Sequence, residues 1–444
     1  MFFFRNFKNF AEAKLDYDKP VTLVVGPNGS GKSNLIEGVE LLAFLASGKP
    51  LHEITDVGRE GGLEIRGGLD ACACRGCDSF TLGFQGNITI EDKIQLVTYE
   101  ISVRVGKQPR ICAETLRLDG REIPVFEVLQ TEEESSSADN EVRYDNNSKG
   151  KFKPTASVAG DRSALSQYTR FARGNKKIQQ TLLVTDAVSL ALSAPSVFDP
   201  TPRLMRGYER VSESRLARNG FNISPALYAL SRARMLVETD PVSGKRNFRS
   251  VSNKETISRI LNWITQLPDE PFADFNFIRT RADDVIFGFK LKDSEETVTA
   301  RLLSDGTLRA LAVLTALETS KKGRRIIIEE FDNGVHPSRV QILAGALFDA
   351  SERNGLRTLV TTHNPATLNA LTVSQLDSVL LTVQDPAAKR SRLLPLTDLP
   401  GYIEFIEKGR LGDLITRRVY EQHLRENYEG QRKEDINKWL ETLP

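Results

Sequence analysis

A glycine-rich run near the start of the chain has the residue types and spacing of a phosphate-binding loop. Residues 26–33 read GPNGSGKS and match G-x4-G-K-[ST], between an apolar β-branched run and a helix-forming stretch. Backbone amides at such a helix N-terminus hold phosphate oxygens. We expect Lys32 to be catalytic by neutralising the β- and γ-phosphates of ATP, and Ser33 to ligate Mg²⁺. The residues predicted to contact ATP in this loop are Gly26, Asn28, Gly29, Ser30, Gly31, Lys32 and Ser33.

Two adjacent carboxylates follow another apolar run, about 300 residues further along the chain. The run 326–328 is three isoleucines and leads directly into Glu329 and Glu330. Ligands of open α/β sheets gather at the carboxyl ends of the strands. We therefore expect Glu329 to support Mg²⁺ and Glu330 to polarise the attacking water. Taken alone the pair is a weak signal, because most such acids are the solvated end of a strand.

Two further polar segments have the character of phosphate contacts. Ser304, Asp305 and Gly306 precede a helical stretch, where hydroxyl and N–H groups can donate to phosphate oxygens. An ordinary helix cap made by Ser304 or Asp305 is the competing interpretation and is compatible with that role. His363 follows a predicted strand, and it is one of four histidines in the chain. We predict that His363 is catalytic and hydrogen-bonds a γ-phosphate.

The cysteines allow a metal site of a different kind. Cys72, Cys74 and Cys77 follow the spacing C-x-C-x2-C, and the fourth cysteine, Cys112, lies in a probable strand. Thiolates this close together can share one Zn²⁺ ion. The spacing is not that of the usual paired C-x2-C knuckle, however, so free thiols in a surface loop are the alternative. Disulfides are not expected in a reducing compartment.

The elements that position these residues alternate between strands and helices. Strands are predicted at 21–25, 326–328, 358–362 and 378–383, with helices at 33–45 and 338–351, which indicates an α/β fold with a mixed or parallel sheet. Alternating apolar residues over 79–128 predict an antiparallel β-subdomain. The predicted domains are 1–162, the phosphate-loop lobe with that subdomain and a mobile loop at 130–155; 163–275, an inserted helical lobe; 276–385, the rest of the head; and 386–444, a helical tail.

Length and composition set broader limits. A chain of 444 residues is too long for one ordinary core. No apolar run reaches the ~18–20 residues that span a bilayer, and the start of the chain lacks the pattern of a signal peptide, so we expect a cytoplasmic protein without membrane contact. The 60 basic and 59 acidic residues balance. Region 203–258 is locally basic and is suited either to DNA phosphates or to a solvated helical surface.

The order of these motifs resembles the ABC-type ATPases of the RecF/SMC/Rad50 class, and it is closest to the OLD-like and AAA-21-like branch. Residues 303–309, LSDGTLR, look like that branch's version of the ABC signature. Residues 329–337, EEFDNGVHP, resemble its Walker B segment, and 361–365, TTHNP, its switch histidine. The stretch 197–206 is similar to its helical lobe. The fold implied is an ABC-ATPase head built around the phosphate loop.

The resemblance covers about residues 1–385 and implies a shared site. In these families Ser304 and Gly306 of one head cap the ATP held by Lys32 of another, which implies a homodimer or a higher even-numbered oligomer. Residues 332–336 would then lie near the dimer interface. The sequence departs from the pattern in two places. Glu329 stands where many relatives have Asp, and the glutamine that senses Mg²⁺ is not obvious; Gln167 is the candidate.

The remaining segments narrow the kind of ATPase. No long heptad repeat is present, which argues against an SMC or Rad50 tether. Only about 80 residues follow His363, without D-x-D, so we expect no nuclease domain. Stand-alone heads of this branch resemble ATPase subunits of anti-phage defence systems that act with a separate nuclease or toxin effector. The alternatives are a RecF-like DNA-repair ATPase and a scaffold that binds ATP without hydrolysing it.

Overall fold

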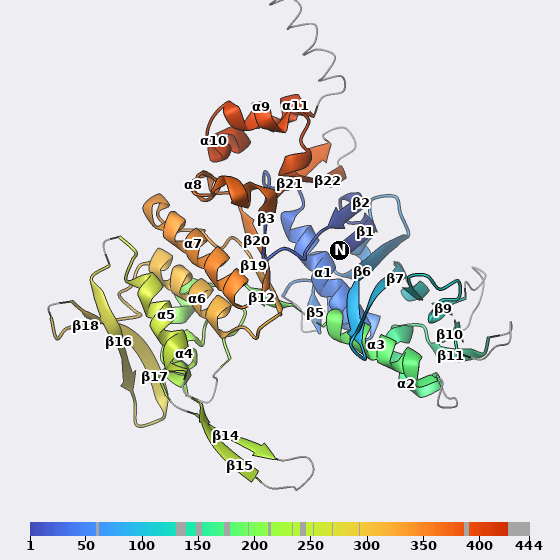
Figure 1. Ribbon diagram of the computed structural model, residues 1–444, viewed down its shortest axis with the longest axis horizontal. Helices are drawn as coiled ribbons and strands as arrows, with labels where there is room; N and C mark the ends of the chain where they lie inside the picture. Colours follow the sequence, from blue (N-terminus) through green and yellow to red (C-terminus); the bar gives the residue numbers. More distant parts are fainter. Residues whose placement is uncertain are drawn as a thin grey trace, which may run out of the picture. The chain divides into compact units, whose positions relative to one another are not determined.

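The computed structural model confirms the predicted α/β class and divides the chain into two compact units. It describes residues 1–58, 62–129, 139–147, 153–172, 178–193, 195–211, 215–232, 234–239, 246–251, 253–268, 270–292, 294–385 and 390–424. The first unit comprises Met1–Asp18, Pro27–Pro195 and Thr382–Leu393. The second comprises Lys19–Gly26, Ser196–Leu381 and Leu394–Pro444. We describe each unit by itself (Figure 1).

The first unit contains an antiparallel sheet in the order β11-β10-β9-β8-β7-β6-β1-β2. Apolar and polar residues alternate along its strands, so that Val97, Tyr99, Ile101 and Val103 of β7 are all buried. The strands are β1 (Phe2–Phe7), β2 (Phe10–Leu15), β6 (Ser79–Ile90), β7 (Lys93–Arg104), β8 (Arg110–Leu118), β9 (Phe126–Val128), β10 (Asp139–Tyr144) and β11 (Thr155–Ala159). β22 (Arg390–Pro395) joins the free edge of β2 in parallel. The antiparallel subdomain predicted for 79–128 is confirmed.

In the described part of the first unit, three helices and several short elements accompany the sheet. The helices are α1 (Lys32–Ala46), α2 (Ala164–Phe171) and α3 (Gln179–Ala191). The short elements are η1 (Leu51–Glu53), β4 (Ile54–Thr55), β5 (Leu63–Glu64) and η2 (Leu69–Cys72). The N-terminus of α2 rests on a buried acid, since Glu114 Oε2 accepts a hydrogen bond from the Ala164 amide at 2.6 Å and Oε1 accepts one from the Leu165 amide at 2.9 Å.

The second unit contains a parallel sheet in the order β21-β3-β20-β19-β12. Its strands are β3 (Val21–Val25), β12 (Ser196–Phe198), β19 (Arg325–Ile328), β20 (Arg357–Thr362) and β21 (Val379–Asp385). Every residue of β3 is buried, and so are Ile326, Ile327 and Ile328 of β19. Continuous apolar runs of this kind are typical of parallel strands covered on both faces.

Helices surround this sheet. Figure 1 shows α5, α6 and α7 side by side, and 13 of the 15 residues of α6 are buried. The helices are η4 (Pro202–Arg206), α4 (Ile223–Ser231), α5 (Lys254–Ile264), α6 (Asp305–Thr319), α7 (Pro337–Arg353), α8 (Pro365–Asn369), η5 (Val373–Ser378), η6 (Leu396–Asp398), α9 (Tyr402–Glu407), α10 (Leu411–Thr416) and α11 (Tyr420–His423). α10 packs on α8, where the Gly412 amide donates to Asn369 Oδ1 at 2.8 Å.

A smaller antiparallel sheet covers α4 and α5 in the order β13-β17-β16, with β18 paired to β17. Its strands are β13 (Glu209–Arg210), β16 (Phe272–Arg279), β17 (Asp284–Leu291) and β18 (Thr297–Thr299). Aromatic side chains fill its inner face, with Phe272 and Phe289 stacked at 4.2 Å between ring centroids. β14 (Arg234–Thr239) and β15 (Arg246–Val251) pair with each other.

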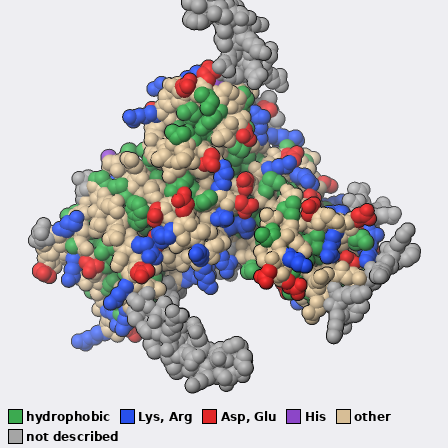
Figure 2. All heavy atoms as spheres, viewed as in Figure 1, with side chains coloured by type: hydrophobic (Ala, Val, Ile, Leu, Met, Phe, Trp, Pro, Cys, Tyr) green, Lys and Arg blue, Asp and Glu red, His purple; other side chains and the backbone are tan. Residues whose placement is uncertain are grey.

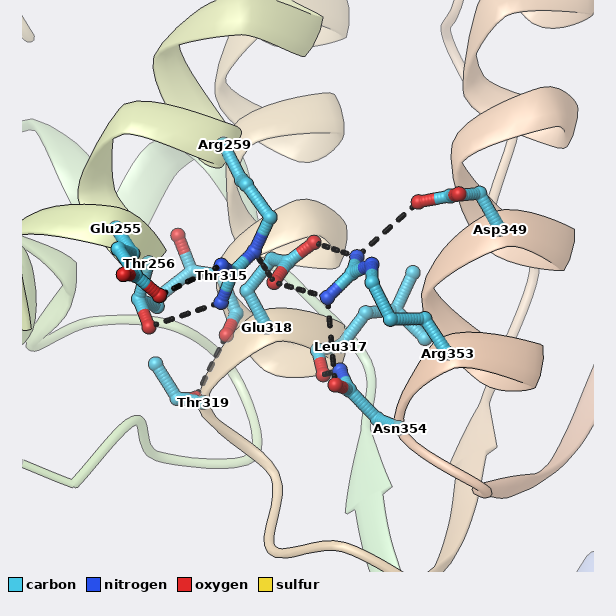
Figure 3. A network of polar contacts seen from close by, with 10 residues as sticks. All are labelled: Glu255, Thr256, Arg259, Thr315, Leu317, Glu318, Thr319, Asp349, Arg353 and Asn354. Carbon is cyan, nitrogen blue, oxygen red and sulfur yellow. Dashed lines mark hydrogen bonds and ion pairs between the residues drawn. The ribbon is translucent and has the colours of Figure 1, made fainter.

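A buried carboxylate ties three helices together (Figure 3). The side chain of Glu318 on α6 is 1% exposed and lies between Arg259 of α5 and Arg353 of α7. Arg259 Nε donates to Oε2 at 2.9 Å, and Arg353 Nη2 donates to Oε1 at 2.6 Å. Arg353 Nη2 also donates to Asp349 Oδ2 at 3.1 Å. The C-terminal end of α6 is therefore fixed by charge-assisted hydrogen bonds to both neighbouring helices.

Three segments differ from their predicted character. The stretch 163–275 is not wholly helical, because it includes β12, β13, β14, β15 and part of β16, and its first 33 residues belong to the first unit. The predicted mobile loop at 130–155 contains β10, while 130–138 and 148–152 lie outside the described residues. The predicted helical tail begins with a strand, β22. Apolar periodicity over such short strands does not distinguish them from buried helix. Among the described residues, we find no helix with the length and apolar character needed to cross a bilayer.

Candidate active site

The phosphate loop is shaped by backbone conformations that favour glycine. Gly29 has φ +80° and Gly31 has φ +106°, in the left-handed region that costs other residues about 1 kcal/mol or more. A Cβ on Gly31 would lie 2.6 Å from Asn9 Nδ2, so the Asn9 side chain would have to move to accept one. Gly31 also caps α1, whose first turn contains no acidic residue. An anion at this helix N-terminus would therefore meet no acidic side chain from the first turn.

The loop is held by its own unit. Asn9 Nδ2 donates to the Ser30 carbonyl at 3.2 Å, and the Ser30 hydroxyl hydrogen-bonds that of Thr382. Lys32 is only 9% exposed, and its Nζ donates to the Pro27 carbonyl at 3.2 Å, so the ammonium group folds back over the loop. Ser33 follows in the first turn of α1. The predicted phosphate-binding residues 27–33 thus form one continuous loop and helix start.

Parallel pairing in the second unit brings the other predicted residues to one edge of a sheet. Val25, the last residue of β3 before the loop, pairs with Thr362 of β20. Ile328 of β19 pairs with Val360 of β20, and Phe198 of β12 pairs with Ile328. The carboxyl ends of four strands therefore align. Asp199, Glu329, Glu330, Thr361 and His363 stand at these ends, and we refer to them as the strand-end cluster.

Glu330 occupies a strained position in this cluster. Its φ is +44°, a left-handed conformation that is uncommon for a residue with a side chain. Its amide donates to Thr361 Oγ1 at 3.0 Å, and its Oε2 accepts from Asn333 Nδ2 at 2.8 Å. Oε1 lies 3.7 Å from His363 Nδ1. Both side chains are close to half exposed, so the carboxylate is fixed in direction while it remains open to solvent.

A buried acid supports the turn after Glu330. Asp332 is 1% exposed, and its Oδ2 accepts hydrogen bonds from the hydroxyls of Thr362, at 2.6 Å, and Thr367. Its Oδ1 has no hydrogen-bond partner in the described part of the chain. Burial raises the pKa of this carboxyl above its ordinary value, while the two threonine hydroxyls oppose the shift. Asp332 therefore joins the segment after β19 to the segment after β20.

Glu329 is paired with an arginine. Arg218 Nη2 donates to Glu329 Oε1 at 3.2 Å. Arg309 of α6 reaches the same strand end, where its Nη1 donates to the Glu330 carbonyl at 3.2 Å and lies 4.0 Å from Asp199 Oδ1. Burial raises the pKa of Asp199, and Arg309 and Arg218 oppose that shift. Sequence reasoning missed Asp199, Arg218 and Arg309 as site residues. The position of Asp199 directly after the apolar pair Val197-Phe198 was the available signal.

The predicted signature segment begins α6. The Ser304 hydroxyl accepts from the Thr307 amide at 3.1 Å, so Ser304 is the helix cap that the sequence allowed. Gly306 lies against the segment after Walker B, and a Cβ there would be 2.7 Å from the Gly334 carbonyl oxygen. Ser304 and Asp305 are exposed, and Asp305 pairs with Arg206 at 2.5 Å. The segment is therefore rigid at its base and open to solvent at its tip.

Gln167 is placed differently from the strand-end residues. It lies in α2 of the first unit, is 8% exposed, and its Oε1 accepts from the Ala159 amide at 3.1 Å. Its Nε2 donates to the carbonyls of Ala159 and Arg162, both at 3.2 Å. The whole amide is thus engaged by neighbouring main chain, an arrangement typical of a structural role.

The predicted zinc site finds no support. Burial raises the pKa of Cys72 to about 12 and also raises that of Cys74, which opposes formation of thiolates. Cys74 Sγ donates to the Phe10 carbonyl at 3.2 Å. Cys72 and Cys74 are buried, so the alternative of thiols in a surface loop is wrong for these two. No group of three or more His, Cys, Asp or Glu in the described residues is arranged to hold a metal ion.

The site residues fit ATP with Mg²⁺ all the same. Mg²⁺ is usually held by one or two protein side chains together with phosphates and waters, so it needs no protein cage. Within the first unit, Ser33 carries a hydroxyl suited to Mg²⁺, and within the second unit, Glu329 carries a carboxylate suited to it; the ion would neutralise phosphate charge. Glu330 is placed to orient a water molecule and accept its proton, with His363 beside it.

Models of two protein families match separate stretches of the chain. A family model described as "AAA domain, putative AbiEii toxin, Type IV TA system" matches residues 199–369, which include the strand-end cluster and α6. A second model, described as "AAA domain", matches residues 4–50, which include the phosphate loop.

Individual relatives match this chain either at low sequence identity or over a short stretch. An ATP/GTP phosphatase of Helicobacter pylori is 24% identical over 371 residues, which cover 81% of this chain and 84% of that protein. A DNA replication and repair protein RecF of Synechococcus is 49% identical, but only over 43 residues, or 10% of this chain and 11% of RecF. A solved SMC head bound to the C-winged helix domain of ScpA covers 89% of this chain and 98% of that one at 12% identity, with a TM-score of 0.48. We draw nothing further from so low a structural similarity.

Proposed function

Because this chain belongs to the RecF/SMC/Rad50 class of ABC-type ATPases, we propose that it hydrolyses ATP at a site completed by a second copy of itself. The loop 26–33 of one copy would hold the triphosphate, and Ser304 with the first amides of α6 would approach it from the other copy. Glu330 would take the proton of the attacking water, and His363 would contact the γ-phosphate. ATP would then join two heads, and hydrolysis would release them.

One observation supports the shared site above the others. The N-terminus of α6 lies at the surface of the second unit. Ser304 is exposed there, and Leu302, two residues earlier, is 76% exposed. A helix N-terminus attracts phosphate, and a large apolar side chain beside it is suited to burial against a protein partner. Leu204, which is 45% exposed, adds a second apolar side chain on η4. These features are accounted for if a second copy covers the tip of the signature segment.

Mass measurement with and without ATP tests this proposal. We expect the wild-type chain to dimerise on ATP only transiently, and Glu330→Gln to accumulate as an ATP-bound dimer because the water is no longer deprotonated. Leu302→Glu should prevent that accumulation, whereas Glu352→Gln, an exposed change on α7, should not alter it. A Glu330→Gln chain that stays monomeric at saturating ATP would contradict the shared site.

We also propose that the ATPase regulates a separate nuclease or toxin effector in an anti-phage defence complex. The family model over residues 199–369, whose description names a putative AbiEii toxin, supports this context. Co-expression with the neighbouring genes, followed by purification and phage challenge, is the test. Co-purification of an effector whose toxicity depends on Lys32 would support the proposal. Wild-type phage sensitivity in cells that carry the intact gene cluster would contradict it.

The RecF-like alternative is less well supported. The RecF match is confined to 43 residues, and in the basic region 203–258 both Arg206 and Arg218 are engaged within the protein. The face drawn in Figure 2 carries basic and acidic side chains intermingled. Salt-dependent binding to duplex DNA, stimulated by ATP, would favour that alternative. Tight ATP binding without any turnover would instead leave the scaffold interpretation.

A further inference from the structure

The segment just before the signature helix has little regular structure of its own. Residues 300–304 connect β18 to α6, and within this connection the Leu302 amide donates to the Thr299 carbonyl at 2.9 Å. Arg301, Leu302 and Ser304 are exposed. Ala300 and Leu303 are buried, and the Ala300 amide donates to the Phe287 carbonyl at 2.9 Å, so part of the connection is anchored. The exposed residues depend on contacts made to the backbone carbonyl groups of the connection.

A single arginine from η4 provides that support. Arg206 Nη1 donates to the carbonyls of Leu303 at 2.7 Å, Arg301 at 2.9 Å and Ala300 at 3.3 Å. Its Nη2 donates to Asp305 Oδ1 at 2.5 Å. Arg206 is about 100 residues earlier in the chain, and the neighbouring Met205 is fully buried in the core, which fixes η4 beneath the connection. One guanidinium group thus holds both the backbone and the first acidic side chain of the segment.

Only arginine can make this set of contacts. The guanidinium group is planar, keeps its charge and presents five N–H donors in a fixed fork, whereas the lysine ammonium group is a compact charge with three rotating donors. Hydrogen bonds from a charged donor to backbone carbonyls are stronger than neutral ones. Loss of the guanidinium would free the carbonyls of Ala300, Arg301 and Leu303 and change the direction of the Ser304 hydroxyl and of the Gly306 amide. The ion pair with Asp305 adds little alone, because Asp305 is 70% exposed.

We propose that Arg206 is a positioning residue for ATP hydrolysis, which sets the signature segment 300–306 in the geometry that contacts the nucleotide. The inference rests on the proposed function, in which that segment acts on the ATP held by another copy. Arg206 itself touches no nucleotide in this scheme. Its substitution should therefore act on turnover and leave nucleotide binding by the phosphate loop intact.

Kinetics of three variants provide the first part of the test. We expect Arg206→Ala to bind a fluorescent ATP analogue within about twofold of wild type but to lose about tenfold or more in kcat. Arg206→Lys should not restore kcat. Arg203→Ala, an exposed change one turn away on η4, should turn over like wild type. Thermal melting checks that each variant is folded. Wild-type kcat for Arg206→Ala, or full rescue by lysine, would overturn the inference.

Mixing experiments separate this inference from the shared site itself. Arg206→Ala mixed with Lys32→Ala should regain about a quarter of wild-type turnover, because half of randomly mixed dimers are mixed and each has one intact site of two. Ser304→Ala mixed with Lys32→Ala should do the same, while Arg206→Ala mixed with Ser304→Ala should regain nothing. Recovery with Ser304→Ala but not with Arg206→Ala overturns the role of Arg206 alone.

Failure of the Ser304→Ala mixture to recover would instead contradict the shared site. The role of Arg206 is then decided by whether Arg206→Ala reproduces the kcat and nucleotide affinity of Ser304→Ala. Matching values support a positioning role within one copy. Different values overturn it.

Discussion

His363 Nδ1 lies 3.7 Å from Glu330 Oε1, and the two residues stand at the carboxyl ends of adjacent parallel strands. The distance is too long for a hydrogen bond, so neither side chain occupies the hydrogen-bonding atom of the other. Asn333 and Thr361 hold Glu330 in place through Oε2 and the backbone amide, respectively. One carboxylate oxygen and one imidazole are thereby left close together and open to solvent, as the proposed binding of a water molecule between base and phosphate requires.

Glu330→Gln should lower kcat about 100-fold or more, because an amide cannot accept the proton of the attacking water. Nucleotide affinity should change little. Steady-state phosphate release, together with equilibrium binding of ATP, measures both quantities. The exposed Glu352 on α7 is the matched control, and Glu352→Gln should behave as wild type. Turnover by Glu330→Gln at the wild-type rate would remove Glu330 from the mechanism.

Lys32→Ala should weaken ATP binding at least about tenfold, since the ammonium group that pairs with the β- and γ-phosphates is lost. Equilibrium titration with a fluorescent nucleotide measures the change. Lys93→Ala, which alters an exposed lysine of β7, should bind normally. Equal affinity in the Lys32 and Lys93 variants would show that loop 26–33 does not carry the nucleotide.

Asp332→Asn should reduce turnover, because Oδ2 links the segments that follow β19 and β20 through Thr362 and Thr367. The asparagine keeps the size of the side chain but replaces one acceptor with a donor, so we expect about a tenfold loss of kcat and a destabilisation of about 1–3 kcal/mol. Chemical denaturation and phosphate release measure the two effects. Asp349→Asn, on the exposed end of the Glu318 network, serves as the control and should leave kcat unchanged. Unchanged turnover in Asp332→Asn would contradict a link through this acid.

The raised pKa of Glu114 should make the free energy of unfolding depend on pH. Burial raises its pKa from 4.5 to about 7, although the Ala164 and Leu165 amides and the Tyr99 hydroxyl oppose the shift. Because the folded protein holds this proton more tightly than the unfolded chain, the contribution of Glu114 to stability is complete below about pH 4.5. It is lost as the pH rises through about 7.

Glu114→Gln should remove that dependence. The unfolding free energy of the variant minus that of wild type should therefore increase by about 1–3 kcal/mol between pH 5 and pH 8. Urea denaturation at several pH values measures the difference. Glu122→Gln, an exposed change in the same unit, should run parallel to wild type. A constant offset between Glu114→Gln and wild type across this range would contradict the assignment.

Glu318 predicts a change in stability without a change in chemistry. Replacing this buried acid with glutamine leaves Arg259 and Arg353 facing each other (Figure 3), although both arginines are about one third exposed to water. We expect a loss of about 1–3 kcal/mol in unfolding free energy. Glu255→Gln, which alters a 94% exposed partner of Arg259, should have almost no effect. Equal stability of these two variants would contradict a stabilising role for the network.

The strands and helices that carry the predicted site residues could largely be predicted from the sequence. The glycine loop, the isoleucine run before Glu329 and the strand before His363 have strong local patterns, and the structure has strands and helices at those positions. The partners Asp199, Arg218 and Arg309 could not be predicted in the same way. Asp199 directly follows an apolar pair, but the roles of all three residues depend on long-range pairing of β12 with β19 and on the reach of flexible side chains, which local spacing alone does not encode.

The region 203–258 illustrates a second limit. A run of arginines predicts a surface for phosphates or for solvent, yet Arg206 and Arg218 face carbonyls and a carboxylate inside the second unit. Charge alone does not distinguish an arginine that binds a partner from one that binds its own chain. The zinc prediction failed for a related reason, because short cysteine spacing says nothing of burial, and burial keeps the Cys72 and Cys74 thiols protonated.

The order of strands in the parallel sheet also determines when the protein can fold. β3, at residues 21–25, is completely buried, but its two neighbours in the sheet are β20 and β21, more than 330 residues later. During synthesis β3 therefore remains an unpaired apolar segment until residues 357–385, which form β20 and β21, have left the ribosome. Contacts of such sequence separation slow folding and expose the chain to aggregation. The phosphate loop that follows β3 can thus be set in place only after these two strands have been made, and chains that stop before residue 357 should bind no ATP.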